Sequence, residues 1–235
     1  MRSPIDFAPL DAAQWPHVTP ADVTVLFQDA ALLVLHKPAG LLSVPGRGPD
    51  KQDCLSARIQ RDFPEALVVH RLDMATSGLM LMARNPQSQR HLHQALSSRL
   101  IEKRYVAIVD GQLLPPAADW GLIDLPIGAD WNQRPLRQVD PVSGKPSQTR
   151  WRVLDQMRQS DGGFSTRVEL VPLTGRTHQL RLHMQALGHP ILGDALYATG
   201  AALAKSPRLL LHASSLRMAH PRTAESLYFT CPPEF

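Results

Sequence analysis

Apolar residues in this chain gather in short runs or alternate with polar ones, a pattern that predicts β-strands. The longest alternating pair, SQTRWRVLDQM (147–157) and FSTRVELVP (164–172), is separated by the turn QSDGG and favours an antiparallel hairpin. The segments predicted as strands are 23–27, 32–38, 66–70, 78–83, 103–111, 147–157, 164–172, 208–221 and 226–232. A sheet should therefore form the centre of the fold.

Helical spacing of apolar residues occurs in fewer places. Residues 53–63 begin with Asp53 as the expected N-cap, and residues 85–99 begin with Asn-Pro, a common helix start. The clearest helix is predicted over 178–188, where Thr177 is the expected N-cap. Because strands outnumber helices, the predicted fold class is α+β, with a mixed, largely antiparallel central sheet flanked by helices and loops.

Proline-rich segments without periodicity mark regions outside this sheet. Residues 1–20 should form an irregular arm, and residues 21–235 should form one domain. A second such segment, residues 124–146, is basic and lacks apolar periodicity, so we expect an irregular surface loop there. The basic residues of this segment that matter below are Arg134, Arg137 and Lys145.

Composition adds a modest basic excess. The chain has 25 Lys and Arg against 21 Asp and Glu, a formal net charge of +4, and a sequence pI of about 9.4. This balance fits a polyanionic partner. With only two cysteines, Cys54 and Cys231, the sequence excludes a disulfide-dense scaffold and a four-cysteine zinc site, and we expect two free thiols.

Other classes of protein are disfavoured by what the chain lacks. The N-terminal residues contain no apolar core of a signal peptide, and no apolar run reaches the roughly 18 residues of a membrane span, so a cytoplasmic location is expected. His91 and His93 point apart on a helix, as do His178 and His183, and no phosphate-loop motif is present. We therefore expect neither a metal nor a nucleotide cofactor.

Asp73 is the most suggestive single residue. It lies in HRLDMATSG (70–78), between two apolar strands, where a sheet can position a carboxylate that solvent still reaches. Hydroxyls and a permissive glycine follow it. The alternative interpretation is a turn aspartate that hydrogen-bonds its own backbone and pairs with Arg71.

Two further residues could assist an acid at position 73. Arg181 lies one turn into the predicted 178–188 helix between two leucines, so its guanidinium needs a carboxylate partner. Beside Asp73 it would favour the ionised acid; elsewhere it would form a structural ion pair. Tyr105 lies in an apolar strand, where it either packs in the core or stacks on an unpaired base.

Five segments in a fixed order resemble the RluA family of RNA pseudouridine synthases. They are HKPAGLLSVPG (36–46), HRLDMATSG (70–78), EKRYVAIV (102–109), GRTHQLRLHMQALGHPILGDALY (175–197) and LLLHASSLRMAHP (209–221). Shorter segments, among them IQRDFP (59–64) and GKPSQT (144–149), resemble the dual-specificity branch of that family. That branch modifies uridine 32 of the tRNA anticodon loop and uridine 746 of 23S rRNA, so the resemblance implies these substrates.

The resemblance also implies roles for individual residues. Asp73 matches the catalytic aspartate of the family, Tyr105 its active-site tyrosine, and Arg181 the arginine that pairs with the aspartate. Arg71 matches an arginine thought to fill the gap left by the flipped nucleotide. Isomerisation of uridine moves a bond without adding atoms, so no cofactor is implied. The target base must leave its stack to be reached.

The remaining expectations concern partners. Many relatives carry an N-terminal S4-like RNA-binding domain, for which the residues before position 23 leave no room. Arg134, Arg137 and Lys145 could close on RNA beside the flipped uridine, in a protein that we expect to be a monomer without an obligate protein partner. Three alternatives stay open: an RNA-binding relative without catalysis, a synthase for another uridine, and a glycoside hydrolase. The last usually needs two opposed carboxylates, and only Asp73 has a convincing context.

Overall fold

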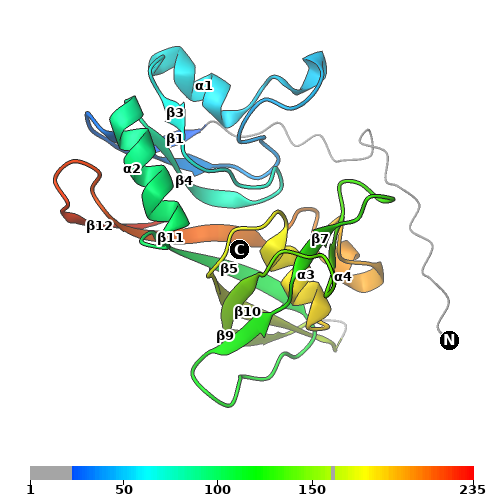
Figure 1. Cartoon of the computed structure of the whole chain (residues 1–235). Coiled ribbons are helices and arrows are strands. Elements are labelled where there is room, and N and C mark those ends of the chain that lie inside the picture. Colours follow the sequence, from blue (N-terminus) through cyan, green and yellow to red (C-terminus); the bar gives the residue numbers. More distant parts are fainter. Residues whose placement is uncertain (1–22, 160–161) are drawn as a thin grey trace.

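A ten-stranded sheet runs through the molecule and carries the helices on its two faces (Figure 1). The computed structural model describes residues 23–159 and 162–235. The main path of the sheet is β1 (Thr24–Gln28), β2 (Leu32–Lys37), β4 (Ser77–Ala83), β11 (Leu211–Ala219), β5 (Glu102–Asp110), β10 (Phe164–Pro172), β9 (Gln148–Arg158) and β6 (Gly121–Asp124). In addition, β12 (Ser226–Thr230) pairs with β11, and β3 (Leu67–Val68) pairs with β4.

The pairing confirms the predicted fold class. Among the strands of the described residues, every pairing is antiparallel except that of β4 with β11. The predicted hairpin is formed by β9 and β10, and each predicted strand segment contains a strand or part of one. The sheet is therefore mixed but largely antiparallel.

Burial on both faces explains why β2 and β4 read as continuous apolar runs. On β2, Leu32 and Val34 pack toward α2 (Pro86–Ser97), whereas Leu33 and Leu35 pack with α1 (Leu55–Asp62). Farther along the sheet, α3 (Gln179–Ala186) packs against β5, β9, β10 and β11. A short helix, α4 (Gly200–Ala204), and a 3-10 turn at Pro49–Lys51 complete the helical elements of the described residues.

One close approach fixes where β4 and β11 meet. Gly78, at a φ of 110°, lies against the backbone of Ala213, and a Cβ atom at this position would lie 2.3 Å from the carbonyl oxygen of Ala213. Only glycine tolerates both this φ and this contact. The parallel pairing of His212 with Ser77 and of Ala213 with Gly78 thus begins directly after the loop that carries Asp73.

Two predicted N-caps are wrong. Cys54 caps α1, accepting a hydrogen bond from the amide of Ala57 at 3.4 Å, while Asp53 turns outward to pair with Arg58. At α3 the N-cap position is occupied by His178 in a left-handed conformation, without a side-chain cap bond. Both errors arise because the N-cap is the residue at which the backbone enters the helix, and residue spacing does not fix that position to within one residue.

The expectation of an irregular loop over residues 124–146 is also wrong. This segment contains β7 (Ile127–Ala129) and β8 (Arg137–Val139), which form a separate two-stranded sheet. Ile127 is buried and packs with Leu182 and Tyr197, so the segment contributes to the core. Three-residue strands are too short to show periodicity, and prolines hide them further. We refer to residues 124–146 as the basic segment.

Some expectations fall on residues that the structure does not describe. The predicted irregular arm at 1–20 lies outside the described residues, as do residues 160–161 of the predicted QSDGG turn. Across residues 23–159 and 162–235, no helix has the length and apolar character that a bilayer crossing requires.

Candidate active site

Asp73 lies in the loop between β3 and β4, and its neighbours hold that loop on both sides. Before it, the hydroxyl of Ser43 accepts from the amide of Leu72 at 3.0 Å and donates to the carbonyl of Leu72 at 2.7 Å. After it, the ammonium of Lys37 donates to the carbonyl of Met74 at 3.0 Å. The Asp73 side chain itself keeps 27% of its surface exposed. The loop therefore presents a fixed carboxylate that solvent can still reach.

Lys37 is a site residue that the sequence analysis missed. Its side chain is fully buried, and its ammonium donates to the carbonyls of Pro38, Leu41 and Met74 at 2.7–3.0 Å. Burial lowers the pKa of Lys37 to about 7, against the opposing effect of the negative charge of Asp73. A lysine inside an apolar strand, followed at once by proline, is the signal that could have identified it.

Arg181 has two carboxylate partners, and the closer one was not predicted. Its guanidinium forms a two-point ion pair with the fully buried Asp194, at 2.8 and 2.5 Å, and its Nη1 lies 3.5 Å from Oδ2 of Asp73. Burial disfavours the charge of Arg181, but the hydrogen bonds and charge of Asp194, together with the charge of Asp73, outweigh this effect and raise its pKa. The structural ion pair and the contact with Asp73 both exist.

His178 and Tyr197 complete the surroundings of the carboxylate. Nε2 of His178 lies 4.0 Å from Oδ2 of Asp73, and Nδ1 of His178 lies 2.9 Å from the hydroxyl of Tyr197. The ring of Tyr197 lies under the guanidinium of Arg181, 5.3 Å from its central carbon. The sequence analysis considered His178 only as a metal ligand. The sequence signal for His178 as a site residue was its position, two residues after Gly-Arg and at the start of the helix that carries Arg181.

Tyr105 lies on β5 with 8% of its surface exposed, in the same core cluster as Leu72. Burial raises the pKa of its phenol, and the negative charge of Asp73 adds to this shift. The core-packing interpretation is therefore confirmed, and the ring also lies within electrostatic reach of Asp73, whereas stacking on an unpaired base stays a prediction.

The structure does not bring the remaining predicted residues to the carboxylate. Arg71 is exposed beside Asp73 in sequence. In the basic segment, exposed Arg134 stacks on Trp131 at 4.4 Å, and Lys145 is exposed. Arg137 is half-buried, and its Nε is one of two buried side-chain polar atoms in the described part of the chain that lack a hydrogen-bond partner. Its backbone amide, however, donates to the hydroxyl of Tyr197 at 2.9 Å.

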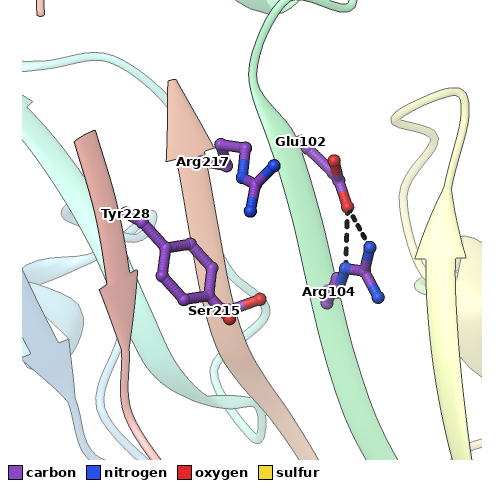
Figure 2. A pocket seen from close by; sticks show the side chains of 5 residues that line it. All are labelled: Glu102, Arg104, Ser215, Arg217 and Tyr228. Carbon is purple, nitrogen blue, oxygen red and sulfur yellow. Dashed lines mark hydrogen bonds and ion pairs between the residues drawn. The ribbon is translucent and has the colours of Figure 1, made fainter. Parts of the chain in front are cut away.

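A polar hollow on another part of the sheet is separate from this site. Figure 2 shows its lining side chains, which come from β5, β11 and β12. Arg104 there pairs with Glu102 at 2.6 Å, and Arg217 stacks on Tyr228 at 5.3 Å. Because neighbouring residues of a strand face opposite sides, Arg104 and Tyr105 lie on opposite faces of the sheet.

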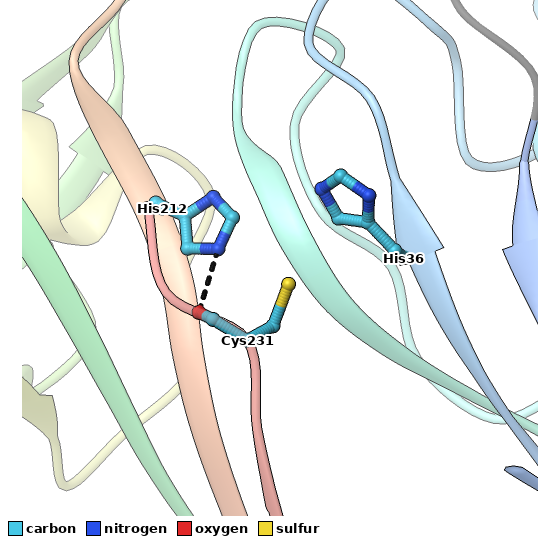
Figure 3. Close-up of side chains that lie close together, drawn as sticks. All are labelled: His36, His212 and Cys231. Atoms are coloured by element: carbon cyan, nitrogen blue, oxygen red, sulfur yellow. Dashed lines mark hydrogen bonds between the residues drawn. The ribbon is translucent and has the colours of Figure 1, made fainter. Parts of the chain in front are cut away.

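The only cluster of possible metal ligands found in the described residues is His36, His212 and Cys231 (Figure 3), whose ligand atoms all lie within 4.8 Å of one another. Both ring nitrogens of His212 are already used, since Nδ1 bonds the hydroxyl of Ser77 at 2.8 Å and Nε2 bonds the carbonyl of Cys231 at 2.9 Å. The positive charge of Arg208 also acts on both imidazoles. The two cysteines of the chain are free, as expected.

Comparison with known proteins identifies the family. The model of the RNA pseudouridylate synthase family matches residues 31–186, which contain Asp73, Tyr105 and Arg181. The chain belongs to the RNA pseudouridine synthase family. This is a family of isomerases, and the match confirms the resemblance found in the sequence motifs.

Relatives within the family agree over most of the chain. A "Dual-specificity RNA pseudouridine synthase RluA" from Yersinia pestis is 49% identical over 211 residues, covering 90% of this chain and 99% of the relative. The protein of the same name from Escherichia coli K12 is 46% identical over 213 residues, covering 91% and 94%. This pseudouridine synthase is therefore of the RluA type.

Solved structures support the same fold. "Human RNA Pseudouridylate Synthase Domain Containing 1" superposes with a TM-score of 0.74 at 28% identity, covering 91% of this chain and 84% of the human one. "Human RNA Pseudouridylate Synthase Domain Containing 4" superposes with a TM-score of 0.68 at 24% identity, covering 89% and 88%. The second likeness concerns the fold alone.

Proposed function

We propose that this pseudouridine synthase isomerises uridine in structured RNA, with Asp73 as the catalytic carboxylate acting on a flipped-out nucleotide. One observation carries the proposal: Asp73 keeps 27% of its side chain exposed while the buried guanidinium of Arg181 lies 3.5 Å away. A reachable carboxylate beside a fixed positive charge is suited to act as a nucleophile or a base.

The reaction requires little else from the protein. The N1–C1′ bond of uridine breaks, the uracil rotates, and a C5–C1′ bond forms, while a proton leaves C5 and another is taken up at N1. Asp73 would attack C6 or C1′ or remove a sugar proton; each route begins from the ionised acid. Arg181 places a positive charge beside that acid, and Asp194 holds the guanidinium of Arg181 in place.

Tyr105 would stack on the uracil. Burial and the neighbouring negative charge of Asp73 raise the pKa of its phenol, so a phenolate is strongly disfavoured at neutral pH. Tyr105 is therefore better suited to hold the ring by stacking than to accept the C5 proton. Arg71, exposed two residues before Asp73, would enter the gap that the flipped nucleotide leaves in the RNA.

For substrates we propose uridine 32 of the tRNA anticodon loop and uridine 746 of 23S rRNA. The support is the identity of 46–49% to relatives named dual-specificity RNA pseudouridine synthases. Arg134, Arg137 and Lys145 of the basic segment would contact the RNA backbone. The proposal has the enzyme act as a cytoplasmic monomer that needs no cofactor, and a synthase directed at another uridine is the alternative.

The test is a comparison of Asp73→Asn with wild type. The variant should lose tritium release from C5-labelled uridine by at least about 10³-fold, the scale of a lost catalytic group. RNA affinity in a gel shift should stay within about twofold, because phosphate contacts supply most of the affinity. Asp119→Asn, at an exposed position, is the matched control.

Two outcomes would contradict the proposal. Turnover of Asp73→Asn near that of wild type would remove Asp73 from catalysis. Wild-type protein that binds both RNAs without releasing tritium would favour the non-catalytic RNA-binding alternative. Chemical mapping of pseudouridine in tRNA and 23S rRNA, before and after incubation with enzyme, identifies the uridine that reacts.

A further inference from the structure

The starting observation is the backbone of His178. It has a φ of 57° and a ψ of 17°, the left-handed region, although it is not glycine. This conformation is unfavourable for a residue with a Cβ atom and is kept only where other contacts determine it. The left-handed backbone directs the imidazole of His178 toward Asp73 and Tyr197. Only 10% of this side chain is exposed.

The hydrogen-bond partners determine where the ring proton lies. The backbone amide of Arg137 can only donate, so the hydroxyl oxygen of Tyr197 accepts from it at 2.9 Å. The hydroxyl proton of Tyr197 then has one recorded acceptor among the described residues, Nδ1 of His178 at 2.9 Å. An imidazole that accepts at Nδ1 carries its proton at Nε2.

The charge state of the ring agrees with this assignment. Burial lowers the pKa of His178 to about 4, although the charge of Asp73 opposes the shift. The ring is therefore neutral at physiological pH and has a single proton. That proton lies on Nε2, the atom that faces Oδ2 of Asp73 at 4.0 Å.

We propose that His178 is a positioning residue for Asp73, and that Tyr197 links His178 to the backbone of the basic segment. Two hydrogen bonds join the amide of Arg137 to Tyr197 and Tyr197 to His178, and a 4.0 Å contact between Nε2 of His178 and Oδ2 continues this series to the carboxylate of Asp73. The inference rests on the proposed function, in which Asp73 is the acid that reacts. It adds a role for two residues and a connection between the RNA-contacting segment and the reacting group.

The geometry also assigns different tasks to the two carboxylate oxygens. Arg181 and His178 both approach Oδ2 of Asp73, at 3.5 and 4.0 Å, and no contact with Oδ1 is recorded in the described residues. A hydrogen bond from Arg181 and the facing N–H of His178 orient the carboxylate through Oδ2 and leave Oδ1 as the oxygen that meets the nucleotide. A movement of about 1 Å brings Nε2 of His178 within hydrogen-bond distance of Oδ2.

The basic segment holds Tyr197 through two contacts. Ile127 of β7 packs with Tyr197 and with Leu182 of α3. The amide of Arg137 in β8 donates to the hydroxyl of Tyr197. The backbone of this segment therefore fixes the position of Tyr197 and, through it, the ring of His178.

The test begins with Tyr197→Phe, which removes one oxygen and keeps the ring under Arg181. The kcat measured by tritium release at saturating RNA should fall roughly 10-fold, the lower range for a lost group that supports acid–base chemistry. The KM and the gel-shift affinity should stay within about twofold of wild type, because Tyr197 and His178 act on the carboxylate of Asp73 and not on the RNA. Tyr228→Phe, at an exposed tyrosine of β12, is the control.

Two replacements of His178 separate positioning from packing. His178→Gln keeps an N–H donor at similar reach, whereas His178→Leu keeps bulk without a donor. The kcat of the Gln variant should exceed that of the Leu variant at least about 5-fold. In the double variant Tyr197→Phe/His178→Leu the kcat should fall no further than in the worse single variant, because both act through one chain.

Failure of this inference is distinct from failure of the proposed function. If Asp73→Asn is inactive while Tyr197→Phe and His178→Leu keep the wild-type kcat, the chain does not position Asp73. The inference would also be overturned by equal kcat values for His178→Gln and His178→Leu. The same holds if the losses of the single variants multiply in Tyr197→Phe/His178→Leu. If Asp73→Asn is itself active, the proposed function fails first.

Discussion

The charges around Asp73 depend on one another. Arg181 is 3% exposed and Asp194 is fully buried, so neither could be accommodated without the other. Asp73, which keeps contact with water, shares the same guanidinium at a longer distance. Arg181 thus has a structural task and, in the proposed function, a catalytic one, so single substitutions at this site will mix the two effects.

The first prediction separates these effects. Arg181→Met leaves Asp194 buried without a cation, which should lower the free energy of unfolding by about 3–5 kcal/mol. The double variant Arg181→Met/Asp194→Asn should recover much of that stability in urea unfolding. Both variants should lose turnover in the tritium-release assay, because the positive charge 3.5 Å from Asp73 is gone. Wild-type turnover in the stable double variant would mean that Arg181 does not support Asp73.

The second prediction concerns Lys37. Burial lowers its pKa from 10.5 to about 7, so between these values the unfolded chain binds a proton that the folded protein has released. The unfolding free energy of wild type should therefore rise relative to that of Lys37→Met as the pH increases from about 7 toward 10. The slope is at most about 1.4 kcal/mol per pH unit.

Lys37→Met should also reduce turnover, because the carbonyl of Met74, next to Asp73, loses one of its two donors and keeps only the amide of Gly40. Urea unfolding of both proteins at several pH values gives the stability difference. Lys51→Met, at an exposed lysine, is the control. A stability difference that stays constant over this pH range would show that Lys37 keeps its proton in the folded state.

At the scale of elements, the sequence predicted most of the sheet and less of what surrounds the site. Alternation of polar and apolar residues predicted β9 and β10, because only one face of such strands is covered. Continuous apolar runs predicted β2 and β4, because both of their faces are covered. The short strands β6, β7 and β8 left no period to detect. Periodicity thus reports an element only when the element is long enough to repeat.

The same limit applies to the site. Asp73, Tyr105 and Arg181 became candidates because of their local context and because family motifs carry them. Lys37 and Asp194 were missed because their importance comes from burial and from partners distant in the sequence. The αL backbone of His178 was likewise not predictable, since no glycine or asparagine marks that position.

The third prediction tests the packing of β4 against β11. Gly78→Ala adds a Cβ atom that would lie 2.3 Å from a backbone oxygen, at a φ of 110°. We expect a loss of roughly 3 kcal/mol or more in unfolding free energy, the sum of strain and overpacking. Turnover should fall as well, because the Asp73 loop leads directly into β4.

Gly188→Ala is the matched control for this variant. Gly188 has a similarly positive φ of 88°, but nothing lies within 4 Å of an added Cβ. It should cost only about 1–2 kcal/mol, the strain alone. Equal losses for the two variants in urea unfolding would mean that the close approach of Gly78 to Ala213 does not constrain the sheet.

At the scale of the whole molecule, the basic segment links the surface proposed to contact RNA to the core. One side is exposed and carries Arg134 on Trp131, while the other packs through Ile127 against Leu182 and Tyr197. A segment anchored in this way loses less conformational freedom on binding than a free loop would. The basic excess of the chain, +4 overall, thus includes arginines in a defined position.

The last prediction follows from that anchoring. Arg134→Ala combined with Arg137→Ala should weaken binding to every RNA substrate and flatten the log–log salt dependence by about 0.7–0.9 for each phosphate that the variant no longer neutralises. The kcat at saturating RNA should stay near that of wild type, because alanine at position 137 keeps the backbone amide that donates to Tyr197. Arg61→Ala combined with Arg90→Ala removes equal charge from exposed positions on α1 and α2 and serves as the control. If the first pair matches wild type in affinity and salt slope, the basic segment does not bind phosphate, and selection of the RNA must depend on the surface around Arg71.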